Sequence, residues 1–118
     1  RIMIGHQNNS EDIGYALSQL KKPGFYLGFD RCNPLMSPAS EDTIVSLVTQ
    51  GYGDRIMLSH DCIFMWLGRP GILPPQFAHW YPNYLFKKIL PKMKAAGVTD
   101  AQIRGIFVEN PRRFFRGV

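Results

Sequence analysis

Charged side chains follow three short apolar runs of this sequence, each at the point where the run ends. His6 follows the first run, Asp30 and Arg31 follow the second, and Asp61 stands just beyond the third. The runs are residues 1–5, 25–29 and 55–59. Because each is apolar on successive residues, the pattern predicts strands buried on both faces of a parallel sheet.

The carboxyl ends of parallel strands open on one face of a sheet, so these four side chains should converge on one site. An imidazole, a carboxylate and a guanidinium that share one mouth can bind a metal ion together with a polarised oxyanion. The residue types and their spacing therefore indicate hydrolytic chemistry.

Each of these residues also has a purely structural interpretation. His6 could cap or pack against a helix, and Asp61 could cap a loop. Asp30 and Arg31 could form a structural ion pair with each other. The pattern alone leaves both interpretations open. Neighbouring strand residues point to opposite faces, so only one of His60 and Asp61 can face the mouth, and we predict Asp61, with His60 toward the helices.

The segment between the first two runs predicts an amphipathic helix over residues 10–22. Its apolar residues recur at i, i+3, i+4 and i+7, the spacing of one helix face. Asn9 or Ser10 is the expected cap, and Pro23-Gly24 is the expected stop.

The segment between the second and third runs predicts another helix, over residues 41–50. It carries an apolar stripe, with Ser40 as the expected cap and Gly51 as the expected stop. Strands that alternate with helices of this length are parallel, and their connections are right-handed.

The chain changes character after the third run. Residues 62–83 combine prolines with aromatic side chains and predict a long loop, of the kind that lines binding sites. A helix is expected over residues 83–96, with a kink or break at Pro91 because proline lacks the backbone donor that a helix interior needs. The last helix should begin with a capping box over residues 99–102 and be interrupted at residues 110–111.

Length and composition predict one soluble domain over residues 1–118. Of the 118 residues, 45% are apolar and 19% are charged, which provides enough apolar surface for a core. Neither a run of 18 apolar residues nor a leader pattern is present, so we expect a cytoplasmic protein without a membrane partner. Cys32 and Cys62 lack the spacing of a metal or redox motif and should be free thiols.

The net charge of +5 raises nucleic-acid binding as a further interpretation. The cations are scattered, apart from clusters at residues 87–94 and 112–116, and such clusters are typical of solvated helix faces. We therefore expect no nucleic-acid partner.

Five separated motifs occur in order along nearly the whole chain. They are residues 4–6 (IGH), 27–31 (LGFDR), 50–52 (QGY), 55–61 (RIMLSHD) and 109–115 (ENPRRFF). Together they resemble the last third of a phosphotriesterase-like hydrolase, of the lactonase-like branch, in the amidohydrolase superfamily. The resemblance implies an α/β fold, a partial (β/α)8 TIM barrel comprising strands six to eight and the C-terminal helices.

The resemblance also implies roles for individual residues. His6 is similar to the strand-six histidine that binds the more exposed of two divalent metal ions. Asp61 is similar to the strand-eight aspartate, which binds the buried ion and, as a catalytic residue, handles the proton of the hydroxide held between the ions. Zinc is the expected metal, with iron, cobalt or manganese as alternatives, since imidazole and carboxylate suit all four.

Two further residues are expected to contact substrate. Arg31 stands where enzymes specialised for organophosphates resemble each other in placing a histidine, whereas lactonase-like members carry Asp-Arg. The resemblance therefore favours a lactone or carboxyl ester as substrate over an organophosphate. Trp66 resembles the loop-eight tryptophan that lines the substrate pocket, where an indole face would hold an acyl chain or leaving group.

The resemblance finally implies metal ligands that this sequence lacks. These are a first-strand His-x-His pair, a bridging carboxylated lysine and a strand-five histidine. Two ligands do not hold a dinuclear centre, and three strands do not close a barrel. We therefore expect the chain to belong to a longer polypeptide or to self-associate, and to hydrolyse esters only together with the missing strands. The alternative is a non-catalytic half-barrel that self-associates through its exposed sheet.

Overall fold

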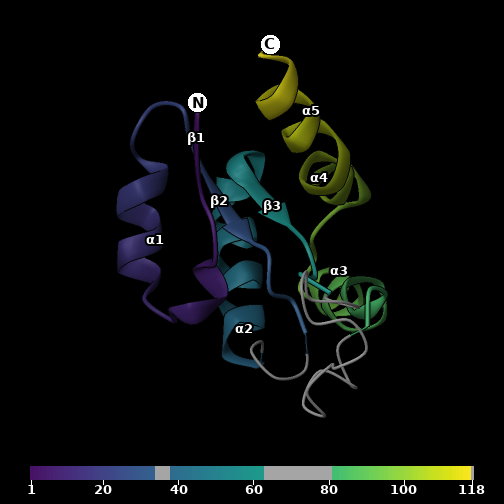
Figure 1. The fold of residues 1–118 in the computed structure, drawn as a ribbon. Coiled ribbons are helices and arrows are strands. Elements are labelled where there is room, and N and C mark those ends of the chain that lie inside the picture. The colour runs from purple at the N-terminus through teal and green to yellow at the C-terminus, as the bar shows by residue number, and fades with distance from the viewer. Residues whose placement is uncertain (34–37, 63–80, 118) are drawn as a thin grey trace, which may run out of the picture.

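The structure is a computed structural model that describes residues 1–33, 38–62 and 81–117. A parallel three-stranded sheet lies at its centre, in the order β1-β2-β3 (Figure 1). The strands are β1 (Ile2–Ile4), β2 (Phe25–Phe29) and β3 (Ile56–Leu58). Leu27 of β2 pairs with Ile4 of β1 and with Ile56 of β3. The predicted parallel α/β arrangement is confirmed.

The helix α1 (Ile13–Leu20) connects β1 to β2 and begins later than the sequence predicts. A 3₁₀ turn (Gln7–Asn9) comes first, so neither Asn9 nor Ser10 is the cap. Asp12 caps the helix instead, because its Oδ1 accepts the backbone N–H of Tyr15 at 2.9 Å. The predicted cap is therefore wrong by two residues or more.

The helix α2 (Pro38–Leu47) connects β2 to β3 and begins earlier than predicted. A proline suits this first position because its missing N–H would have no partner there. The predicted cap at Ser40 is wrong, since residue 40 lies inside the helix. A π-helical turn (Val48–Tyr52) follows α2, and within it Gly51 leaves the helical conformation, with φ 91°. Glycine tolerates this conformation best, so the predicted stop at Gly51 is confirmed.

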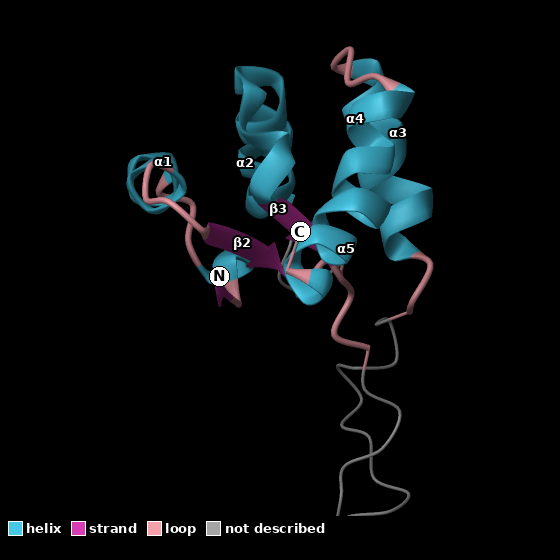
Figure 2. Cartoon of the chain, turned by 90° about the horizontal axis from the view of Figure 1, so that it is seen from above, coloured by secondary structure: helices cyan, strands magenta, loops and turns pink. Residues whose placement is uncertain are grey.

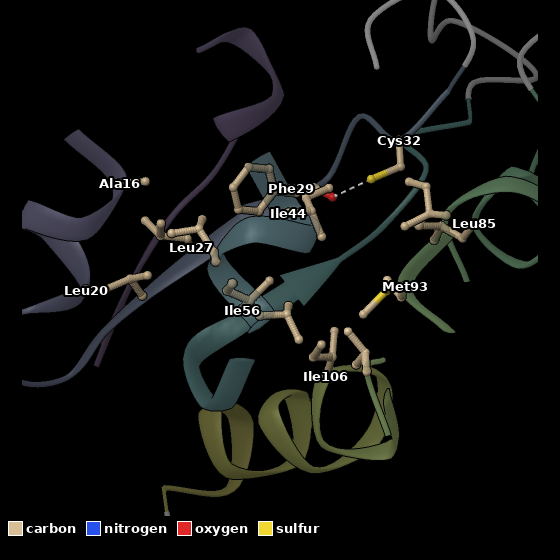
Figure 3. Close-up of a cluster of buried hydrophobic side chains, with 14 of the residues drawn as sticks. Ala16, Leu20, Leu27, Phe29, Cys32, Ile44, Ile56, Leu85, Met93 and Ile106 are labelled. Carbon is tan, nitrogen blue, oxygen red and sulfur yellow. Dashed lines mark hydrogen bonds between the residues drawn. The ribbon is translucent and has the colours of Figure 1, made fainter. Parts of the chain in front are cut away.

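The core lies between the sheet and the helices on one of its faces. Figure 2 shows α1 and α2 on the same side of the sheet. Figure 3 shows Leu27 and Ile56 of the sheet in one buried cluster with Ile44 of α2. β2 is buried along most of its length, whereas Ile2 and Met3 of β1 are 53% and 42% exposed. The prediction of burial on both faces thus fails for β1, which is an edge strand of the described sheet.

Among residues 81–117 lie the helices α3 (Leu90–Ala95), α4 (Asp100–Arg104) and α5 (Asn110–Arg116). The predicted capping box is confirmed, because Thr99 and Gln102 bond each other's backbone N–H. No helix among residues 1–33, 38–62 and 81–117 is long and apolar enough to cross a membrane.

The prolines of the last two helical segments do not break the chain's helical path. A π-helical turn (Leu85–Ile89) precedes Pro91, and another (Gly105–Glu109) precedes Pro111. In each turn the backbone bond reaches one residue further back than in an α-helix, from residue 90 to 85 and from residue 110 to 105. The wider turn accommodates a residue that cannot donate. A break at Pro91 and the predicted interruption at residues 110–111 are therefore wrong, whereas a kink at Pro91, the other expectation, stays a prediction.

Candidate functional site

His6 stands at the carboxyl end of β1, where its side chain meets Asp30 from the end of β2. The backbone of His6 is left-handed, with φ 58° and ψ 32°. Its backbone N–H donates to Oδ1 of Asp30 at 2.9 Å, and its ring Nδ1 lies 2.9 Å from the same oxygen. Because an ionised carboxylate only accepts, this geometry assigns the ring hydrogen to Nδ1 and leaves a lone pair on Nε2.

Gly5 permits this close approach between the two strand ends. A Cβ atom at residue 5 would lie 3.0 Å from Oδ2 of Asp30, closer than most real contacts. A larger residue just before His6 would therefore push the Asp30 carboxylate away by a few tenths of an ångström.

Arg31 joins His6 to Asp61 across the mouth of the sheet. Its Nε donates to Oδ2 of Asp61 at 3.2 Å, and its Nη2 lies 3.3 Å from Nε2 of His6. The Arg31 and Asp61 side chains are 28% and 35% exposed, and that of His6 is 52% exposed. The structure thus brings three of the predicted site residues together at one solvent-accessible edge.

The contacts of Asp30 and Arg31 differ from the ion pair between these two residues that the sequence left open. Asp30 pairs with His6, and Arg31 pairs with Asp61, so each bonds across to another strand end instead of to its neighbour in sequence.

Asp61 follows β3 in a left-handed conformation, with φ 48°. The turn here also engages His60, whose Nδ1 accepts the backbone N–H of Cys62 at 2.9 Å. Aspartate and histidine are among the residues that tolerate this region, and such backbone conformations gather at functional sites. The orientation of His60 toward the helices stays a prediction.

Asn8 is a site residue that sequence reasoning missed. Its side chain is buried, its Oδ1 accepts the backbone N–H of Arg31 at 2.9 Å, and its Nδ2 donates to Sγ of Cys32 at 3.6 Å. Asn8 therefore fixes the backbone from which the guanidinium extends. The only available signal was a run of polar residues after His6, which is equally typical of an ordinary turn.

Cys32 lies beneath this edge as a free, fully buried thiol. Its Sγ donates to the backbone oxygen of Phe29 at 3.1 Å, and burial raises its pKa to about 12. A thiol that stays protonated at neutral pH is a poor metal ligand. The prediction that both cysteines are free is confirmed for Cys32 and for Cys62.

The side chains at the mouth suit a metal ion, although they supply only part of its coordination shell. Nε2 of His6 and the carboxylate of Asp61 are neutral-nitrogen and oxygen donors of the kind that divalent ions take. Among the described residues, no group of three or more His, Cys, Asp or Glu side chains is arranged to hold an ion. Trp66, the other residue predicted to contact substrate, lies outside the described residues.

The sequence matches the profile of the Phosphotriesterase family over residues 1–115. The chain belongs to this family. It is 33% identical to the aryldialkylphosphatase of Saccharolobus solfataricus over 98% of this chain and 38% of that protein. It is 31% identical to the phospho-furanose lactonase of Mycoplasmopsis synoviae over 96% of this chain and 33% of that protein.

A solved structure gives the same result for the fold. The organophosphorus hydrolase from Deinococcus radiodurans superposes with a TM-score of 0.82 at 34% identity, over 98% of this chain and 37% of that one. The fold of this phosphotriesterase-family chain is a partial (β/α)8 barrel, as predicted. The chain spans between 33% and 38% of the length of these three relatives.

Proposed function

We propose that this chain supplies part of the active site of a divalent-metal hydrolase that acts on ester bonds. The observation that carries the proposal is the meeting of His6 and Asp61 at one guanidinium, with Nε2 of the imidazole directed there. Membership of the Phosphotriesterase family supports it.

Each residue at the mouth has a role that follows from its contacts. Nε2 of His6 would hold a metal ion, and Asp30 keeps the imidazole in the required tautomer by accepting its Nδ1 hydrogen. The carboxylate of Asp61 would hold a second ion and could accept a proton from water. Divalent ions bound there supply the Lewis acidity that acidifies water and polarises a carbonyl or phosphoryl oxygen.

The substrate is a small ester, and we favour a lactone or carboxyl ester over an organophosphate. Arg31 favours this choice of substrate, because its guanidinium adds a fixed positive charge where a histidine would add a titratable one. The relative from Mycoplasmopsis synoviae is named a phospho-furanose lactonase, which agrees with that choice. Trp66 is proposed to line the acyl side of the pocket.

Two ions, with zinc as the proposed metal, require ligands beyond His6 and Asp61. We propose that those ligands come from the barrel strands that the relatives contain outside the matched third of their length. Catalysis then requires the chain together with those strands, in a cytoplasmic protein.

The test is a zinc titration of the 118-residue chain, followed by calorimetry, with His6→Ala and Asp61→Ala as the variants. Saturable uptake that is lost in both variants supports the proposal. His60→Ala is the matched control, because it removes a neighbouring imidazole and should leave the uptake unchanged. Zinc uptake that persists unchanged in both His6→Ala and Asp61→Ala contradicts the proposal.

A second candidate is a non-catalytic half-barrel that self-associates through β1. The observation that favours it is the exposure of Ile2 and Met3 on an edge strand of the described sheet. Sedimentation velocity tests it, because Met3→Lys should then convert an oligomer to a monomer. Val108→Lys, which alters an exposed apolar residue on another element, should not. A monomeric wild-type chain rules this candidate out.

A further inference from the structure

We propose that the guanidinium of Arg31 is an internal substitute for the metal ion, which it must vacate before an ion binds. The inference rests on the proposed function and extends it to the way in which the site is loaded. It assigns Arg31 a role in metal affinity, separate from any contact with substrate.

The geometry shows a direct competition for the same lone pairs. The Nη2 atom of Arg31 lies 3.3 Å from Nε2 of His6, and the Nδ1 hydrogen of that ring is already committed to Asp30. Nε2 is therefore the acceptor of a guanidinium hydrogen, and it has only one lone pair. A metal ion on Nε2 and the Arg31 hydrogen bond exclude each other.

The same guanidinium also holds Asp61. Its Nε donates to Oδ2 of the carboxylate at 3.2 Å, so one cationic group satisfies both proposed ligands at once. A carboxylate has further lone pairs, and Asp61 alone could bind an ion and Arg31 together. The imidazole cannot, so loading at His6 is the step that requires Arg31 to move.

The backbone around Arg31 is fixed, which limits the movement to its side chain. The N–H of Arg31 donates to the buried Asn8 at 2.9 Å, and the N–H of the next residue, Cys32, donates to the oxygen of Ser59 at 3.1 Å. The guanidinium is 28% exposed and bonds to partners that are more exposed than itself. Rotation of the Arg31 side chain can therefore release both ligands without disturbing β2.

The expected effect on affinity is moderate. An ion pair of this exposure is weak, so removing its cation should tighten zinc binding by about 2- to 5-fold. Arg31→Gln removes the charge and keeps a polar side chain. Arg31→Lys keeps a charge on the single Nζ atom and lacks the planar fork whose Nε and Nη2 atoms reach Asp61 and His6. If competition by contact is correct, both variants bind zinc more tightly than the wild type. If charge alone matters, only Arg31→Gln does, and the proposal is overturned.

A spectroscopic readout tests the movement itself. In a zinc titration at neutral pH, followed by ¹⁵N NMR of arginine side chains, the Nε–H signal of Arg31 should move to the position of a solvated guanidinium as the His6 imidazole signals shift. Arg113, which donates to the backbone oxygen of Asp54 at 2.8 Å, is the matched control and should not move.

The two proposals fail in different ways in this experiment. Zinc that shifts the His6 signals and leaves the Arg31 signal unchanged overturns the substitution and leaves the hydrolase proposal standing. Zinc that moves the Arg31 signal and leaves the His6 signals unchanged overturns both, because His6 is then not a ligand. Circular dichroism of each variant checks that its fold is intact.

Discussion

The two ends of the central sheet are built from different kinds of contact. At the amino end of β3, the buried Asn110 donates from Nδ2 to the backbone oxygens of Gly53 and Ile56, each at 2.7 Å. At the carboxyl end, His6 and Asp61 themselves have a left-handed backbone. Their side chains bond to charged, partly exposed partners, Asp30 and Arg31.

The difference indicates a division of labour within the sheet. Neutral, buried hydrogen bonds are costly to remove, because they leave backbone oxygens without partners. Exposed ion pairs contribute little to stability, and left-handed residues cost some of it. In barrels of this kind, the amino end maintains the fold and the carboxyl end carries out the chemistry.

The largest expected effect is therefore at Asn110. Asn110→Leu should lower the free energy of unfolding by about 2–4 kcal/mol, because the carbonyls of Gly53 and Ile56 lose a buried donor. Urea denaturation measures this change. Asn9→Ala, an exposed asparagine, is the control and should change the stability by less than about 0.5 kcal/mol.

A smaller loss is expected for the buried asparagine at the other end. Asn8→Ala should cost about 1–2 kcal/mol, because the backbone N–H of Arg31 loses its side-chain acceptor and Cys32 loses a weak bond to its sulfur. Hydrogen exchange should show faster exchange of the Arg31 amide in this variant. If Asn8→Ala proves more destabilising than Asn110→Leu, the proposed division of labour between the ends is wrong.

Alkaline pH should lower the free energy of unfolding through Cys32, which lies beneath the carboxyl end of the sheet. Burial raises the pKa of the Cys32 thiol from 9.0 to about 12, so below pH 9 both the folded and the unfolded chain keep the proton. Above pH 9 only the unfolded chain releases it, so stability falls as pH rises toward 12, by about 1 kcal/mol near pH 10.

The buried Tyr84 acts in the same direction. Its hydroxyl donates to Glu41 at 2.6 Å, and burial together with this carboxylate raises its pKa. Urea denaturation across alkaline pH should show the loss, with a shallower slope in Cys32→Ser and an unchanged slope in Asn110→Leu. A slope that Cys32→Ser leaves unaltered means that the thiol does not contribute.

The sequence allowed the strands to be located closely, because successive apolar residues are a local signal. β2 has the predicted bounds, and the other two strands lie inside the predicted runs. The convergence of the strand ends followed from topology alone, which is why His6, Arg31 and Asp61 could be named in advance.

The features that sequence reasoning missed depend on contacts between distant residues. The role of Asn8 depends on Arg31, 23 positions away, and that of Asn110 on Ile56, 54 positions away. The prediction that proline breaks a helix failed for a different reason. It assumes the hydrogen-bond pattern of an α-helix, whereas the π-helical turns before Pro91 and Pro111 accommodate a residue without an N–H donor.

The smallest expected effect tests backbone conformation at the two ends. Residue 61 has φ 48°, so Asp61→Gly should be more stable than Asp61→Ala by about 0.5–1 kcal/mol, although both lose the ion pair to Arg31. Residue 110 is helical, with φ −65°, so Asn110→Gly should be less stable than Asn110→Ala by about 0.5–1 kcal/mol. Thermal melts of the four variants measure both differences. If glycine is more stable than alanine at residue 61 and less stable at residue 110, the left-handed backbone of residue 61 costs stability. If glycine is less stable at both positions, residue 61 carries no backbone strain.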